Sequence, residues 1–139
     1  MNWLIWSLLS ALFAGLTAIL AKIGVKDVDS NLATAVRTTV VLVFAWAVCF
    51  LTNRPTVVLG LTQRNWLFLG LSGLATGLSW LCYFRALQMG EASKVAPIDK
   101  LSVVFVLLFA AVFLGESLTW KTGLGGVLIV AGAIVLTLK

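Results

Sequence analysis

The stretch that decides the fold is Asn65–Phe84, NWLFLGLSGLATGLSWLCYF, which contains no charged residue. A helix rises about 1.5 Å per residue, so a run of about 20 apolar residues is long enough to cross the hydrocarbon core of a bilayer. The run lacks the regular polar and apolar alternation of a membrane-spanning strand, which would also need a closed barrel. We therefore predict a transmembrane helix over 65–87.

Comparable apolar runs lie on both sides of this segment. The predicted spans are 3–23, 31–51, 65–87, 95–114 and 119–138. The fourth is long enough only if it begins before Asp99 and Lys100, which places Pro97 in its first turn, where proline is tolerated. The sequence thus predicts an all-α integral membrane bundle of five transmembrane helices, forming a single domain over 1–139.

The composition excludes most soluble classes. Hydrophobic residues make up 61% of the 139 residues and charged residues 11%, against about 25% charged residues in soluble domains. This excludes a soluble enzyme domain, a disordered chain and a disulfide scaffold. The chain has no histidine, which removes His-based catalysis and most zinc sites. We expect no enzyme activity, no cofactor and no metal site. The basic residues lie between the apolar runs, so the net charge of +5 does not indicate a nucleic-acid partner.

An odd number of spans places the two termini on opposite membrane faces. Basic residues are fewer on the face of the N-terminus than on the other: Arg54, Arg64 and Lys121 against Lys22, Lys26, Arg37, Arg85, Lys94, Lys100 and Lys139. The positive-inside rule then predicts N-out, C-in insertion in the cell (inner) membrane. If Arg37, Arg85 and Lys100 lie within the bundle, the bias nearly vanishes, and dual topology remains open.

Several ionisable residues fall inside or at the ends of the predicted spans, namely Lys22, Arg37, Arg85, Asp99 and Lys100. A charge at the centre of a span costs about 2.5–3.5 kcal/mol, so these side chains must pair or face water. Two interpretations remain open. Asp99 could pair with one of the cations in a purely structural cluster. Alternatively, because one carboxylate cannot neutralise four cations, the cluster could bind an anionic or zwitterionic solute.

Small and aromatic residues give two further alternatives. Gly73, Gly77, Trp80 and Phe84 share one helical face, with Tyr83 beside it, so this face either packs in the core or forms an aromatic wall for a solute. Small residues also mark close helix contacts in membranes. Glycines of this kind are Gly15, Gly73, Gly77, Gly125 and Gly132. They predict packing within one chain or a dimer seam.

The region from Trp80 to Ser102 resembles a known family signature. The residues Trp80-x-x-Tyr83-Phe84-Arg85-Ala86-Leu87-Gln88, followed by Val95-Ala96-Pro97-Ile98-Asp99-Lys100-Leu101-Ser102, are similar to helices 3 and 4 of the EamA-like branch of the drug/metabolite transporter superfamily. Phe113-Leu114-Gly115-Glu116 and the Gly-rich last run fit that family's ending. The resemblance covers essentially the whole chain.

The resemblance implies a function and a mode of assembly. Family members commonly contain two inverted five-helix repeats and transport small metabolites by alternating access. This chain is similar to one repeat and should therefore work as a dimer, for which an antiparallel arrangement is open. The positions that the resemblance assigns to the substrate pathway are Trp80, Tyr83, Arg85, Asp99, Lys100 and Ser102. Arg37 and Lys22 join them on the charge argument above. A heteromeric subunit, or a channel or structural membrane protein without turnover, are the alternatives.

Overall fold

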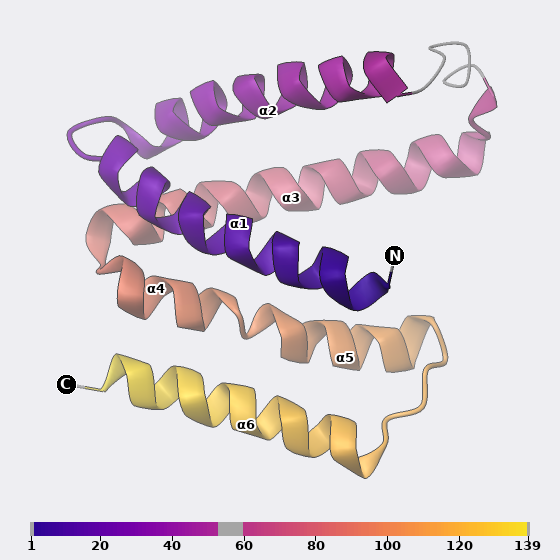
Figure 1. Cartoon of the computed structure of the whole chain (residues 1–139). Coiled ribbons are helices and arrows are strands. Elements are labelled where there is room, and N and C mark those ends of the chain that lie inside the picture. Colours follow the sequence, from indigo (N-terminus) through magenta and orange to yellow (C-terminus); the bar gives the residue numbers. More distant parts are fainter. Residues whose placement is uncertain (1, 53–59, 139) are drawn as a thin grey trace. The chain divides into compact units, whose positions relative to one another are not determined.

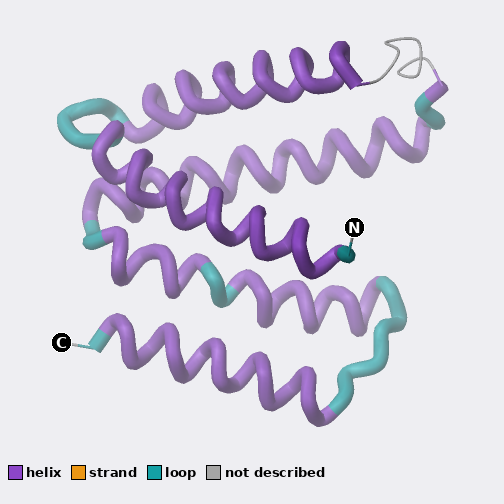
Figure 2. The backbone as a smooth tube through the Cα atoms, viewed as in Figure 1, coloured by secondary structure: helices purple, strands orange, loops and turns teal. Residues whose placement is uncertain are grey.

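The computed structural model describes residues 2–52 and 60–138. Within these residues the chain is helical and contains no strand (Figure 2). The elements, labelled in Figure 1, are α1 (Trp3–Gly24), α2 (Ser30–Thr52), α3 (Gln63–Met89), α4 (Ala92–Asp99), α5 (Ser102–Phe113) and α6 (Trp120–Thr137). Arg54 and Lys139, which entered the topology argument, lie outside the described residues. The predicted all-α class is confirmed.

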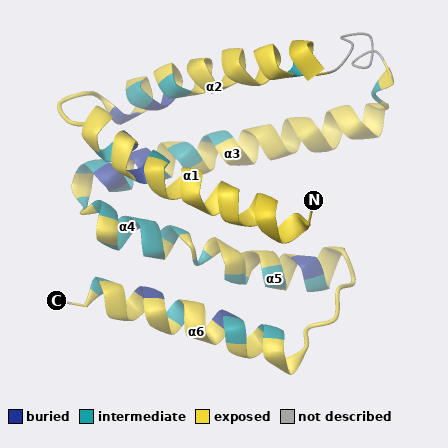
Figure 3. Ribbon diagram, in the orientation of Figure 1, coloured by how far each residue is buried: buried dark blue, intermediate teal, exposed yellow. Residues whose placement is uncertain are grey.

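The predicted five spans are also confirmed. The described residues contain five segments long and apolar enough to cross a membrane: α1, α2, α3, α6 and the segment Ala92–Phe113, which joins α4 and α5. Their surfaces are largely apolar and exposed (Figure 3). Leu74 on α3 is 68% exposed and Val127 on α6 is 63% exposed. Such exposure suits helices whose solvent is lipid, because lipid tails are as apolar as these side chains.

The chain divides into two compact units, one made of residues 1–21 and 89–139 and the other of residues 22–88. The prediction of one domain over 1–139 stays a prediction. In the first unit, α6 packs against both α4 and α5 (Figure 1). Gly126 on α6 lies beside Leu107 of α5, whose Cδ1 would be 3.5 Å from an added Cβ. A small residue here allows the two helices to approach closely.

The second unit contains α2, α3 and the turn between α1 and α2. This turn fixes the start of α2, since Asp29 Oδ1 accepts hydrogen bonds from the backbone N–H groups of Asn31 and Leu32 at 2.9 and 3.0 Å. A carboxylate in this place satisfies amides that have no partner within the helix. Asp27 has a φ of 60°, a left-handed conformation that aspartate tolerates better than most residues. Val25 is buried, with 2% exposure.

The fourth span differs from the expected continuous helix, because it is interrupted at Lys100 and Leu101. The backbone N–H of Leu101 donates to the carbonyl of Ile98, three residues earlier, and Val103 donates likewise to Lys100. These are tight 3₁₀-type bonds, which mark hinges or local strain within longer helices. The helix begins at Ala92, so Pro97 lies beyond the first turn, where its missing N–H removes a helical hydrogen bond.

Candidate functional site

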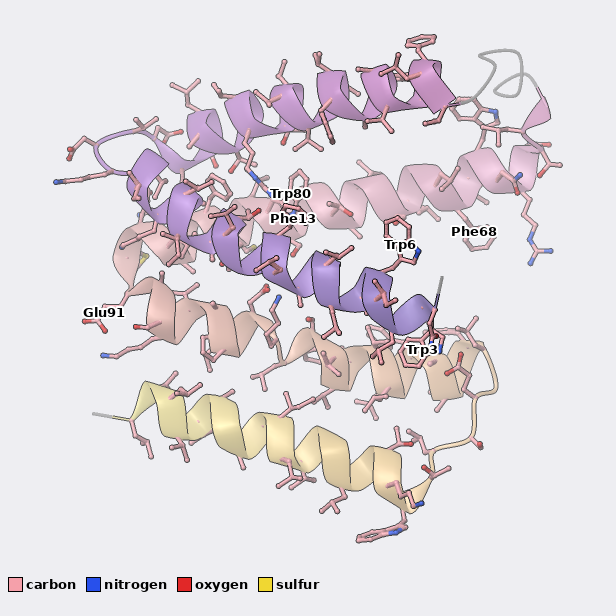
Figure 4. The ribbon with its side chains drawn as sticks, in the orientation of Figure 1. Trp3, Trp6, Phe13, Phe68, Trp80 and Glu91 are labelled. Carbon is pink, nitrogen blue, oxygen red and sulfur yellow. The ribbon has the colours of Figure 1, made fainter. Side chains whose placement is uncertain are left out.

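The most distinctive polar arrangement in the second unit is built around Arg37. Its guanidinium carbon lies 4.2 Å from the ring centroid of Trp80 and 5.5 Å from that of Phe84. Arg37 lies about two helical turns into α2, and both rings belong to α3, where Figure 4 labels Trp80. Arg37 and Trp80 are half-buried, and Phe84 is buried, with 3% exposure. The structure therefore brings together two predicted pathway residues, Arg37 and Trp80, and one further aromatic residue of the predicted face, Phe84.

This stacking stabilises the charge of Arg37 without a carboxylate. A guanidinium over an aromatic face is attracted by the ring quadrupole, by about 2 kcal/mol where water is excluded. Among the described residues, the ion pairs join Lys94 to Glu91 and Lys100 to Asp99, and neither includes Arg37. The guanidinium carbon lies over both rings, and the N–H donors of a guanidinium lie in one plane and match a carboxylate or phosphate in a two-pronged geometry.

A second group lies where α3 ends. The Lys22 amine donates a hydrogen bond to the carbonyl of Leu87 at 2.5 Å, and Arg85 Nη1 donates to Gln88 Oε1 at 3.1 Å. A cavity of about 430 Å³ is present here, lined by Lys22, Val25, Lys26, Asp27, Leu87 and Gln88. Sequence reasoning placed Lys22 and Arg85 but missed Gln88. The sequence signal for a contact between Gln88 and Arg85 was their spacing of three residues, which places the amide and the arginine on the same helical face.

In the first unit, Asp99 and Lys100 lie at the interruption between α4 and α5. The Lys100 amine and Asp99 Oδ2 are 3.4 Å apart. Of the cations considered as partners for Asp99, the one that pairs with it here is thus Lys100, the next residue in the chain. The two residues lie about two turns from the start of α4, which is deeper than a first-turn position. A groove of about 380 Å³ borders this site, lined by Ala96, Pro97, Lys100, Ile129, Ala133 and Leu136.

The remaining predicted residues have simpler surroundings. Tyr83 is half-buried on α3, and Ser102 is exposed at the start of α5. The glycines Gly15, Gly73, Gly77, Gly125 and Gly132 have open space where a Cβ would be added. Their role in helix packing or in a dimer seam stays a prediction. The assignment of all the named residues to a substrate pathway also stays a prediction.

Comparison with known proteins supports a transport function. The model of the EamA-like transporter family matches residues 1–138. The chain is 50% identical to an "uncharacterized transporter in cobO 3′ region" from a Sinorhizobium species, over 97% of this chain and 96% of that protein.

A second relative comes from Erwinia tasmaniensis. It is a probable 4-amino-4-deoxy-L-arabinose-phosphoundecaprenol flippase subunit, ArnE, which is 33% identical over 60% of this chain and 78% of its own length. No solved structure matches the chain. The family match extends over nearly the whole chain and agrees with the five apolar spans. The chain therefore belongs to the EamA-like transporter family and is a multi-pass membrane protein.

Proposed function

We propose that the chain transports a small metabolite that carries an anionic or zwitterionic group, by alternating access across the inner membrane. The observation that carries this proposal is the position of Arg37 over Trp80 and Phe84 within a membrane span. The rings stabilise the cation inside the span, and neither ion pair in the described part of the chain includes Arg37, whose guanidinium carries planar N–H donors. A carboxylate or phosphate on a solute is the group that matches those donors.

We further propose that Asp99 and Lys100 are substrate-pathway residues. Discontinuous helices commonly form the substrate and ion sites of transporters. The backbone at Lys100 and Leu101 stays close to helical, so the support here comes from the two charges at the change from α4 to α5. The interruption between α4 and α5 carries one side chain of each sign. Such a pair complements a zwitterionic solute, with Lys100 directed to its carboxylate and Asp99 to its ammonium group. Trp80, Tyr83, Arg85, Ser102 and Lys22 complete the proposed lining.

The proposed functional unit is a dimer of identical five-helix chains, inserted in opposite orientations. Five spans place the termini on opposite faces, so an inverted pair needs both insertions. The near balance of basic residues outside the spans supports that arrangement. The alternative is a heteromer with a different five-helix chain. It is favoured by one observation, that the relative from Erwinia tasmaniensis is itself named as a subunit.

Transport in proteoliposomes tests the solute class. We would measure uptake of labelled acetate, glutamate, alanine and choline by the purified chain, with Arg37→Ala as the variant. Saturable uptake of an anionic or zwitterionic probe that is lost in Arg37→Ala supports the proposal. Uptake of choline alone, or uptake that is unaffected by Arg37→Ala and by Lys100→Ala, would contradict it. Arg64→Ala serves as the matched control, because Arg64 also contacts a ring but near the start of α3.

Labelling of single cysteines tests the assembly. Cys49 and Cys82 are first replaced by serine, and one cysteine is placed at Asn2 or at Leu138 in intact cells. Labelling of both positions from outside by an impermeant maleimide supports opposite insertion of identical chains. Labelling of Asn2 alone supports N-out, C-in insertion and the heteromeric alternative. In that case activity should appear only when the purified chain is combined with a second five-helix protein.

A further inference from the structure

The side chain of Gln88 uses both ends of its amide group in three hydrogen bonds. Its Nε2 donates to the backbone carbonyl of Val28 at 2.5 Å and to that of Val25 at 3.5 Å. Its Oε1 accepts from Arg85 Nη1 at 3.1 Å. All four residues belong to the unit formed by residues 22–88. One side chain thus connects the turn between α1 and α2 with an arginine on α3.

The chemistry of the partners permits only one orientation of this amide. Backbone carbonyls can only accept hydrogen bonds, and a guanidinium can only donate them. The reverse orientation would place the amide oxygen against two carbonyl oxygens and the amide NH₂ group against the Arg85 donors. Both contacts would then be repulsive. The carbonyls of Val25 and Val28 therefore fix the direction in which Oε1 points.

The turn that supplies these carbonyls is itself held in place. Val25 is buried, and the backbone N–H of Val28 donates to the Val25 carbonyl at 3.5 Å. Asp29 caps the start of α2, immediately after the turn. The Lys22 amine adds a separate tie to the end of α3 through the carbonyl of Leu87. A restrained turn can act as a fixed point, whereas an exposed arginine at a helix end otherwise samples many rotamers.

We propose that Gln88 is a positioning residue, which transmits the geometry of the turn between α1 and α2 to the guanidinium of Arg85. Its functional meaning rests on the proposed function, in which Arg85 lines the substrate pathway. Movement of the turn would then redirect Arg85 without any direct contact between the two. Gln88 is proposed to set the direction of the guanidinium rather than to hold the helices together. The hydrogen bond from Lys22 to the Leu87 carbonyl connects the end of α1 with the end of α3 without Gln88.

Two substitutions separate the two ends of the amide. Gln88→Glu keeps an acceptor for Arg85 and loses the donors to the turn. Gln88→Lys keeps a donor for the turn and loses the acceptor. The full-length chain in lipid vesicles is treated with phenylglyoxal, an arginine reagent, and modification of Arg85 is followed by mass spectrometry with Arg64 as the internal reference. Hydrogen exchange of the segment 24–30 reports on the turn in the same samples.

We expect opposite patterns in the two variants. In Gln88→Lys the modification rate of Arg85 should rise about fivefold, as expected from the loss of one hydrogen bond of ordinary strength at an exposed site, while exchange in 24–30 stays at the wild-type rate. In Gln88→Glu the turn should exchange faster while Arg85 stays protected. Gln63→Lys, on the same helix at its other end, should change neither measurement.

Two results would overturn the inference. One is an unchanged rate at Arg85 in Gln88→Lys. The other is a parallel rise of both measurements in both variants, which would mean that Gln88 only holds the fold together. Neither measurement requires a solute, so the outcome is independent of the transport assay. If Arg85→Ala leaves uptake unchanged while the labelling pattern is as expected, the pathway role of Arg85 fails and the positioning role of Gln88 stands.

Discussion

The chain accommodates charge within its spans in two different ways. In the unit formed by residues 22–88, Arg37 lies over the rings of Trp80 and Phe84. In the other unit, Lys100 pairs with the adjacent Asp99 at an interrupted helix. An ion pair neutralises both charges, whereas a ring face stabilises a cation without neutralising it. The Asp99–Lys100 pair is thus balanced in charge, whereas Arg37 keeps its positive charge beside the rings.

The largest effect is expected at Arg37. Arg37→Ala should lower the uptake efficiency, kcat/KM, of an anionic or zwitterionic probe by about 10- to 100-fold, the range for loss of a hydrogen bond to a charged group. Arg37→Lys should recover only part of it, because an ammonium lacks the planar, two-pronged donors. Uptake kinetics in proteoliposomes measure both. If the lysine variant were as active as the wild type, the planar geometry of the guanidinium would not be needed for uptake.

The ring beneath Arg37 is expected to have the next largest effect. Trp80→Leu should lower uptake efficiency by about tenfold through loss of the cation–π contact, and Trp80→Phe should lower it less, because a smaller ring remains. Phe68→Leu, on the same helix, is the control. Initial uptake rates over a range of probe concentrations show whether the leucine variant loses more uptake efficiency than the phenylalanine variant. If the leucine and phenylalanine variants have the same uptake efficiency, the contact between the Arg37 cation and the aromatic ring does not contribute to transport.

The pair at the interrupted helix gives a smaller, structural effect. Asp99→Asn leaves the Lys100 ammonium without its partner at the break, so we expect the variant to be destabilised by about 1 kcal/mol, less than the full cost of a charge at a span centre because the break is partly open. The double variant Asp99→Asn/Lys100→Gln should regain part of that loss. Thermal unfolding in detergent micelles measures the stability of each variant, and the departure from additivity is the interaction energy between the two charges. Strictly additive losses would show that the two charges do not interact.

The smallest effect is expected at Arg64, whose guanidinium lies 5.8 Å from the ring centroid of Phe68. This contact is near the start of α3, where both residues are exposed. Cation–π contacts at exposed sites contribute only about 0.5–1 kcal/mol. Arg64→Ala should therefore leave uptake within about twofold of the wild type. A loss as large as that in Arg37→Ala would show that depth in the span does not distinguish the two arginines.

Much of the fold could be predicted from the sequence, because the length of an apolar run is a local property. Spans such as 3–23 and 65–87 agree with α1 and α3 to within two residues at each end. The interruption at Lys100 and Leu101 was not predicted. Proline in a first turn is compatible with a straight helix, and the start at Ala92, which places Pro97 further inside, depends on where the preceding turn ends.

The candidate site was predictable only in part. The residue types at 37, 80, 85, 99 and 100 stood out because charges and a tryptophan within apolar runs are unusual and demand partners. Which partner each one has was not predictable. The sequence left Asp99 free to pair with any of several cations, and it gave no reason to place Arg37 over Trp80 rather than beside a carboxylate. The contact of Gln88 with Arg85 has a local signal, but its contacts with carbonyls 60 and 63 residues away in the chain have none.

The amino-acid sequence by itself determined that this protein crosses a membrane five times, with charges inside its spans and a family signature from Trp80 to Ser102. These properties follow from the composition and from the order of residues along short segments. They do not depend on which segments contact one another in space. Only the tertiary structure decided that aromatic rings stabilise Arg37 and that the amide of Gln88 connects Arg85 with the turn between α1 and α2. Each of those depends on the direction of a side chain, which is fixed when separate segments pack together.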